Sequence, residues 1–263
     1  MKLRYFVADA FTDAVFGGNP AGVCALEGPL DAALMQRIAA ENNLSETAFV
    51  YPAETPGDYN LRWFTPNSEI DLCGHATLGT SFIVANFVTP GIETMRFSTM
   101  SGILTVQREG ELFTMDFPNR MPTPVDVTPE MTAVMGAAPQ QALLSRDLVL
   151  VYENRQQVAD LKPDLNAMQQ LPDGLGVIAT APGDGEADFV CRCFYPKLNV
   201  PEDPVTGSAH SNLIPLWAEK LGKTEMISHQ ISARGGVLRC RLAGERVRIS
   251  GKAALYLQGE INV

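Results

Sequence analysis

The sequence predicts an α+β protein made of two similar halves, each a set of short, curved strands around one central helix. Three observations support this prediction. Strand-like runs with alternating apolar residues recur along the whole chain. Each half contains one helix that is apolar on most faces, and such a helix is expected to be buried. Similar glycine-containing turns precede the two helices, about half a chain length apart, which suggests an internal duplication.

The first half is expected to span residues 1–118. Its central helix is predicted at 75–87, where the run Thr77–Ala85 is strongly apolar. Three prolines follow within residues 117–124, a composition typical of an extended connection, so we place the boundary there. The other predicted elements of this half are a helix at 30–42 and strands near 3–8, 20–26, 47–52, 59–65, 94–99, 102–108 and 111–117.

The second half is expected to span residues 119–263, around a central helix at 208–221. Terminal strands are free to cross from one half to the other. The remaining predicted elements are helices at 129–136 and 164–170 and strands near 148–152, 175–180, 188–195, 227–234, 236–242, 246–250 and 254–261. The two halves therefore share the same arrangement of elements.

Charge and composition exclude several partners. Twenty basic and thirty acidic residues give a net charge of -10, and the densest basic stretch, 239–248, alternates with apolar residues as a strand face does. We therefore expect no nucleic-acid partner. No apolar run approaches the roughly 20 residues that a membrane helix requires, and the first residues resemble a strand rather than a signal peptide. These features predict a cytoplasmic protein without a membrane partner.

The five cysteines are odd in number and lack the paired spacing of zinc sites, so neither a disulfide framework nor a metal site is expected. Cys191 and Cys193 lie in an alternating segment and would face the same side of a strand. We interpret them as buried small apolar residues rather than metal ligands.

The turns Asp71–Ala76 and Asp203–Ala209 precede the two central helices. A helix N-terminus presents free backbone N–H groups and the positive end of a dipole, and glycine allows a ligand to approach the backbone closely. Two such turns would form an anion site without lysine or arginine, which suits a carboxylate. The alternative, two ordinary capped helix starts, remains open.

Several polar residues near these turns are candidates for chemistry. His75 stands at the start of the first central helix, where a structural histidine is the alternative interpretation. Asp203 is by default a turn or cap residue. Ser208 lies next to His210, but the chain has no G-x-S-x-G elbow, so a donor or cap role is favoured over a hydrolase nucleophile.

Glu46 lies between a predicted helix and a predicted strand. By pattern alone it is an ordinary surface glutamate. Its importance comes from a resemblance. Five segments, in the same order and across most of the chain, resemble those of the PhzF-like family of phenazine biosynthesis: Gly18–Val23, Asn43–Val50, Arg62–Pro66, Leu72–Gly79 and Glu202–His210.

The resemblance implies a diaminopimelate-epimerase-like fold, with two related domains and a site in the cleft between them. It also implies a homodimer without a metal or an organic cofactor. The implied activity is isomerisation of a small carboxylated metabolite, unsaturated or cyclic, by general acid–base proton transfer. The implied catalytic residues are Glu46, His75 and Asp203, and the implied substrate-binding residues are Gly74, Gly207, Ser208 and Asn19.

Two alternatives stay open. Relatives with this fold include amino-acid racemases and epimerases that use two cysteines, one at each central turn. Cys73 occupies the first position, but Thr206 stands at the second, so the second thiol is missing. A non-catalytic protein that binds small molecules is the other alternative. The isomerase hypothesis further predicts that both glycine turns hold the anionic end of one substrate.

Overall fold

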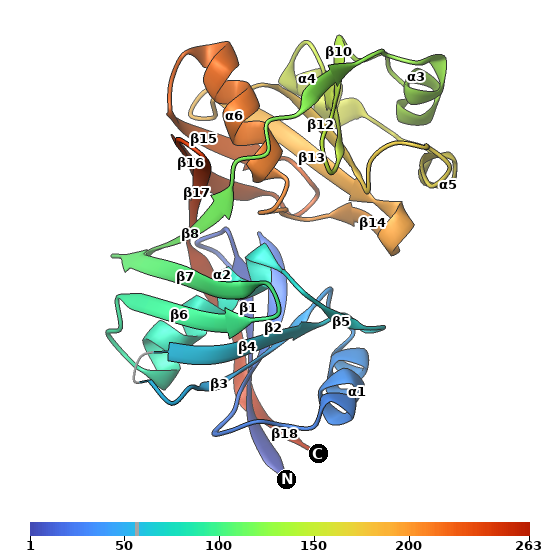
Figure 1. The fold of residues 1–263 in the computed structure, drawn as a ribbon. Helices are drawn as coiled ribbons and strands as arrows, with labels where there is room; N and C mark the ends of the chain where they lie inside the picture. Colours follow the sequence, from blue (N-terminus) through green and yellow to red (C-terminus); the bar gives the residue numbers. More distant parts are fainter. Residues whose placement is uncertain (56–57) are drawn as a thin grey trace. The chain divides into compact units, whose positions relative to one another are not determined.

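The computed structural model describes residues 1–55 and 58–263, which divide into two compact units. Unit 1 contains Met1–Asp116 together with the C-terminal segment Ser250–Val263, and unit 2 contains Phe117–Ile249. Figure 1 shows the elements of both units. None of the helices in the described part of the chain combines the length and apolarity that crossing a bilayer would require.

The described residues of unit 1 form a mixed sheet with two helices and one π-helical segment, Val84–Val88. The helices are α1 (Ala32–Asn42) and α2 (Gly74–Ile83). The strands are β1 (Lys2–Ala10), β2 (Asn19–Ala25), β3 (Thr47–Pro52), β4 (Asp58–Phe64), β5 (Glu69–Ile70), β6 (Thr94–Thr99), β7 (Gly102–Glu109), β8 (Leu112–Pro118) and β18 (Ala253–Asn262).

Unit 2 is also a mixed sheet, with four helices and a short 3-10 segment, Pro196–Leu198. The helices are α3 (Pro129–Met135), α4 (Arg155–Asp160), α5 (Leu165–Met168) and α6 (His210–Leu221). The strands are β9 (Thr123–Val125), β10 (Gln141–Leu144), β11 (Leu148–Val151), β12 (Val177–Pro182), β13 (Phe189–Tyr195), β14 (Val200–Asp203), β15 (Glu225–Gln230), β16 (Gly236–Ala243) and β17 (Arg246–Gly251).

The two units repeat one order of strand pairing. In unit 1, β1 and β2 are antiparallel, β2 and β3 parallel, β3 and β4 antiparallel, and β4 then pairs antiparallel with β5 and parallel with β6. Unit 2 repeats the same sequence of pairings from β10 to β15. The central helix lies at the same point of each unit: α2 precedes β6 in unit 1, and α6 precedes β15 in unit 2. This shared topology confirms the α+β fold of two related domains.

Both central helices are buried, as their apolar sequences predict. Every residue of α2 except Phe82 is buried. Because Gly79 has no side chain, the helix packs closely against Ala21 of β2. The hydroxyl groups of Thr77, Thr80 and Ser81 donate to carbonyls four residues earlier, which satisfies these polar groups inside the core. In α6, Trp217 stacks on Phe189 of β13 with ring centroids 5.7 Å apart.

The central helices differ from the prediction at their ends. The predicted helix 75–87 is α-helical only to Ile83 and continues as the π-helical segment. The helix predicted at 208–221 begins at His210, because Gly207–Ala209 form a turn whose carbonyls accept from N–H groups three residues later. The strands β5, β9, β10 and β14 and the helix α4 were not predicted. Each has six residues or fewer, too short for a clear periodic pattern.

Candidate active site

Glu46 lies at the junction of α1 and β3. The C-cap of this helix is Asn43, which adopts a left-handed conformation with φ 49° and whose N–H donates to the Ala39 carbonyl. The chain then turns into β3, and the Glu46 carbonyl accepts a hydrogen bond from the Gly22 N–H of β2 at 3.1 Å. The backbone of Glu46 is therefore held by the sheet although the residue lies outside a strand.

The start of α2 brings Cys73 and His75 to the same place. Cys73 is the N-cap, with an extended backbone, and its side chain makes no capping hydrogen bond. Gly74 is the first helical residue. The first N–H groups of a helix have no acceptor within the helix, a feature that suits an anion.

Glu46 and His75 form the centre of this site. Oε2 of Glu46 lies 3.0 Å from Nε2 of His75, and the two side chains are only 15% and 7% exposed. The ring N–H is not aligned with the carboxylate oxygen, so neither atom has a well-directed hydrogen-bond partner among the described residues. Both atoms therefore keep hydrogen-bonding capacity for a ligand. On the other side of the ring, Nδ1 lies 3.5 Å from Sγ of Cys73.

The surroundings of His75 favour its charged form. Burial opposes an imidazolium, but the attraction of Cys73 and Glu46 raises the pKa of His75 well above its ordinary value. Burial and the nearby Glu46 carboxylate also raise the pKa of Cys73, so this thiol stays protonated near neutral pH. We therefore attribute the charge on His75 mainly to the Glu46 carboxylate. The site therefore pairs the Glu46 carboxylate with the His75 imidazolium, and both side chains are largely buried.

The site also contains three types of metal-binding atom within 4.8 Å of one another: a carboxylate oxygen of Glu46, the sulfur of Cys73 and a ring nitrogen of His75. Zinc sites use such atoms. Here, however, Nδ1 of His75 faces Cys73 and Nε2 faces Glu46, so an ion held by one ring nitrogen would be directed away from one of the other two groups. The geometry suits proton transfer better than a shared ion. The expectation of a site without metal or cofactor stays a prediction.

Asn19 begins β2 and is fully buried. Strands β2 and β3 are parallel neighbours, and Gly22 pairs with Thr47. Asn19 and Glu46 therefore both lie near the N-terminal ends of these two strands. This placement is compatible with the predicted substrate-binding role.

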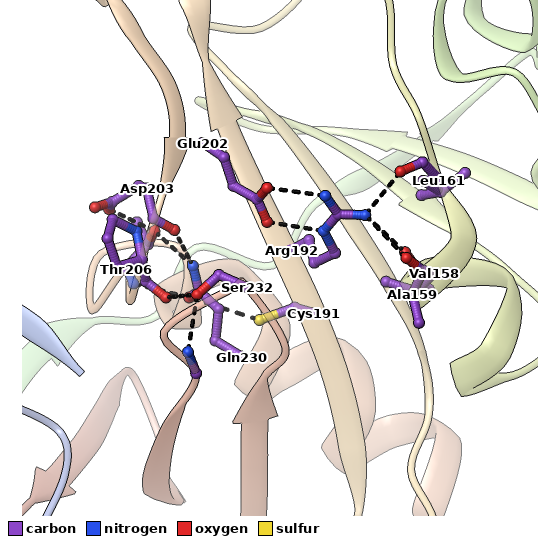
Figure 2. A network of polar contacts seen from close by, with 12 residues as sticks. Val158, Ala159, Leu161, Cys191, Arg192, Glu202, Asp203, Thr206, Gln230 and Ser232 are labelled. Carbon is purple, nitrogen blue, oxygen red and sulfur yellow. Dashed lines mark hydrogen bonds and ion pairs between the residues drawn. The ribbon is translucent and has the colours of Figure 1, made fainter. Parts of the chain in front are cut away.

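Unit 2 contains the other predicted site residues in the turn between β14 and α6. Asp203 ends β14, and its Oδ2 accepts a hydrogen bond of 2.6 Å from the Thr206 hydroxyl. Figure 2 shows that Gln230 of β15 holds this turn: its side-chain amide donates to the Asp203 carbonyl at 2.7 Å and accepts from the Thr206 N–H at 2.8 Å. Gln230 is buried, and no sequence motif pointed to it.

A second contact holds β14 beside this turn. Arg192 of β13 forms a two-pronged ion pair with Glu202, at 2.7 and 2.8 Å. The same guanidinium donates to the carbonyls of Val158 and Leu161 at the end of α4 (Figure 2). Glu202 therefore has a structural role next to Asp203.

Of the two roles predicted for Ser208, donor or helix cap, the cap role was wrong. The N-cap is Ala209, without a side-chain hydrogen bond, and the Ser208 hydroxyl instead accepts from Nη2 of Arg146 at 3.3 Å. Arg146 also lies 3.3 Å from the fully buried carboxylate of Asp147, whose pKa is raised by burial against the opposing effect of Arg146. Because Arg146 can only donate, the Ser208 O–H remains a donor for another group.

The remaining candidates have structural roles. Both ring nitrogens of His210 contact other groups, the Thr206 carbonyl at 2.9 Å and the Ser228 hydroxyl at 2.8 Å, which agrees with rejecting a hydrolase pair with Ser208. Cys191 and Cys193 are free and buried, as predicted.

Two grooves occur elsewhere in the described residues. One of about 370 Å³ is lined by Pro215, Glu219 and Lys223 of unit 2, and one of about 520 Å³ by Leu34, Arg37 and Ile261 of unit 1. No candidate site residue lines either groove. The candidate site is therefore identified by its chemistry and not by the size of a cavity.

The structure thus forms two polar clusters from the predicted residues. Unit 1 joins Glu46 with His75 at the start of α2, and unit 2 holds Asp203 against Thr206 in the turn that also contains Gly207 and Ser208. That both clusters hold one substrate stays a prediction.

The chain thus has a duplicated α+β fold of two related domains, with a carboxylate–imidazole contact at the start of one central helix. The chain belongs to the PhzC-PhzF family of phenazine biosynthesis-like proteins, whose model matches residues 8–259. It is 47% identical to an uncharacterized isomerase of Pseudomonas aeruginosa over 263 residues, which is the whole of both chains. Such names support isomerase activity at the level of the family.

Solved structures agree with this assignment. A PhzF family protein of Enterococcus faecalis matches with a TM-score of 0.97 and 47% identity over the whole of both chains. A hydroxyproline epimerase of Agrobacterium vitis matches 99% of this chain and 91% of its own with a TM-score of 0.63. Its identity is only 10%, so this second likeness concerns the fold alone.

Proposed function

We propose that this protein is a cofactor-independent isomerase in which Glu46 moves a proton on a small carboxylated metabolite, unsaturated or cyclic. The observation that carries the proposal is the 3.0 Å contact between Glu46 and His75 at the start of α2. A carboxylate at low exposure can accept a proton from carbon and return it as an acid. The adjacent imidazolium would stabilise the negative charge that forms on the substrate.

Each step of the proposed reaction uses a named group. Glu46 would take the proton from a carbon next to the unsaturated or carboxylated centre, and the electron pair would move into the conjugated system. The proton would then return at another carbon. The N–H groups at Gly74 and the turn at Gly207, together with the Ser208 hydroxyl, would bind the carboxylate, and Asp203 would act as the second acid–base group.

Two observations disfavour the two-thiol racemase. The pKa of Cys73 is raised by burial and by Glu46, which makes its thiol a poor source of thiolate. At the second position, the Thr206 hydroxyl donates to Asp203 at 2.6 Å instead of supplying a thiol. Epimerisation through Glu46 and Asp203 remains the second candidate, because the same two groups could return the proton to the opposite face of the same carbon.

The deciding experiment is proton exchange in deuterated water. Cyclic unsaturated carboxylic acids and α-amino acids are incubated with the enzyme, and mass spectrometry detects deuterium and any isomer formed. We expect Glu46→Gln to keep the fold and to lower exchange by a factor of about 10² to 10⁴, because an amide cannot accept the proton. Glu41→Gln, at an exposed position of α1, is the matched control and should keep full exchange.

Unchanged exchange in Glu46→Gln would remove Glu46 from the mechanism. A compound that stabilises the protein against heat without exchanging any proton would instead indicate a binding protein. We also propose a homodimer in the cytoplasm, without a nucleic-acid or membrane partner. Analytical ultracentrifugation checks the dimer, and a single-chain mass in solution would contradict it.

A further inference from the structure

Cys73 and Glu46 lie against opposite nitrogens of the His75 ring. Sγ of Cys73 is 3.5 Å from Nδ1, and Oε2 of Glu46 is 3.0 Å from Nε2. As whole residues, Cys73 and His75 are only 7% and 5% exposed, so solvent is largely excluded from the Nδ1 side. A donor S–H at Nδ1 therefore favours the proton on Nε2 whenever the ring is neutral, on the side where the Glu46 carboxylate can accept it.

A thiol is suited to this position because it is both a weak donor and a weak acceptor. It can accept from Nδ1–H when the ring is an imidazolium, and it can donate S–H to Nδ1 when the ring is neutral. Burial and Glu46 raise the pKa of Cys73, so the proton needed for the second arrangement is present near neutral pH. An ionised carboxylate at the same place could only accept.

We propose that Cys73 is a positioning residue that keeps a proton on Nε2 of His75, the ring nitrogen 3.0 Å from Glu46, in both charge states of the ring. The catalytic meaning of this inference rests on the proposed function of Glu46. If Glu46 changes its protonation during turnover, His75 must remain a donor on that side throughout. In a neutral ring with its proton on Nδ1, Nε2 would be an acceptor facing Glu46. His75 would then have no donor on that side to stabilise the negative charge that develops on the substrate.

This role differs from that of a racemase thiol, which exchanges protons with the substrate itself. Substitution by serine separates the two roles. A hydroxyl is also a donor and an acceptor, so Cys73→Ser should preserve the orientation of His75. A hydroxyl is a far weaker acid than a thiol, so the same substitution should abolish two-thiol chemistry.

The test requires no ligand. The full chain is labelled with 15N-histidine, and long-range proton–nitrogen NMR spectra give the protonation of each ring nitrogen from about pH 6 to about pH 10, on both sides of the ordinary histidine pKa. His75 is assigned among the three histidines with a His75→Gln variant. We expect wild type and Cys73→Ser to show the Nε2–H form whenever His75 is neutral, and Cys73→Ala and Cys73→Val to lose this single form.

Cys24→Ala is the matched control, because Cys24 is also a buried thiol of unit 1 and lies in β2. It should leave the His75 signals unchanged. An unchanged Nε2–H form in Cys73→Ala or Cys73→Val would overturn the inference. A His75 that remains doubly protonated in every variant would also overturn it, since Cys73 would then select no tautomer. The valine variant keeps the test valid if the alanine cavity prevents folding.

Activity gives a second readout. In the deuterium-exchange assay, Cys73→Ala should lower kcat about tenfold, the size of one net hydrogen bond, with KM unchanged. Cys73→Ser should restore kcat, and an inactive serine variant would contradict the positioning role. The two proposals fail separately: active Glu46→Gln removes the proposed function, whereas the NMR result concerns Cys73 alone.

Discussion

The three histidines of the chain show how the surroundings of a residue determine its chemistry. His210 is buried, with both nitrogens engaged by the Thr206 carbonyl and the Ser228 hydroxyl. His229 is half-buried, and burial together with Arg155 lowers its pKa. Among the described residues only His75 contacts a carboxylate at ion-pair distance, and its pKa is raised. The same side chain therefore supports packing in one place and forms a contact with a carboxylate in another.

The raised pKa of His75 predicts how stability changes with pH. A group whose pKa is raised by folding stabilises the folded state fully below its unfolded pKa of about 6.5, and this contribution is lost as pH rises through the folded pKa. We therefore expect the difference in unfolding free energy between wild type and His75→Gln to be largest near pH 6 and to shrink toward higher pH. Urea unfolding at several pH values measures it. A difference that grows with pH would contradict the assignment of charge to His75.

At the scale of elements, the turn between β14 and α6 depends on a strand that follows it in the sequence. Gln230 of β15 donates to the Asp203 carbonyl and to the Thr206 hydroxyl, and accepts from the Thr206 N–H. Because β13 pairs parallel with β15 and antiparallel with β14, the strand pairing positions Gln230 for these bonds. The proposed role of Asp203 therefore requires the sheet to be correctly formed.

Removing the Gln230 amide should loosen this turn. Gln230→Met keeps the side-chain volume but leaves the buried Thr206 N–H without its acceptor, which should lower the unfolding free energy by about 2 kcal/mol. Proton exchange should fall with it, since Asp203 loses its fixed position. Gln156→Met on the exposed face of α4 is the control and should cost little. An unfolding free energy of Gln230→Met equal to that of wild type would show that the turn is stable without the Gln230 side chain.

At the scale of the whole molecule, the chain leaves unit 1 after Asp116 and returns to it at Ser250. The returning strand β18 pairs antiparallel with β1 from Ala10 opposite Ala253 to Lys2 opposite Asn262. At the re-entry, an added Cβ on Gly251 would lie 2.4 Å from Phe11 and 3.1 Å from Leu78 of α2, so glycine allows this strand to pack closely against the core. Unit 1 is therefore discontinuous in sequence, whereas unit 2 is a single segment.

This arrangement predicts which fragments fold. Residues 117–249 expressed alone should give a cooperative unfolding transition, because they contain β9 to β16 and most of β17. Residues 1–116 alone should remain unfolded, since β1 would lose its partner β18, and addition of a 250–263 peptide should restore structure. Circular dichroism and proton–nitrogen NMR spectra measure both. A folded 1–116 fragment would show that β18 is dispensable.

Local sequence was sufficient for most of the fold. The strands at 47–52 and 94–99 were predicted to the residue, and the helices at 30–42 and 129–136 within two residues, because alternation, helical periodicity and turn residues act over short distances. The two central helices were recognised because an apolar helix must be buried wherever it lies. The order of strand pairing could not be derived in this way, since it joins segments far apart in the chain.

The sequence by itself determined which residue types stand at the two glycine turns, and the family motifs identified Glu46. Tertiary structure decided what each of these residues contacts. Glu46 meets His75, Asp203 is held through Gln230, and Ser208 accepts from Arg146 instead of capping α6. The physical reason is that periodicity and composition record burial and local conformation, whereas the pKa and hydrogen bonding of a side chain depend on neighbours that only the folded sheet brings within a few ångströms.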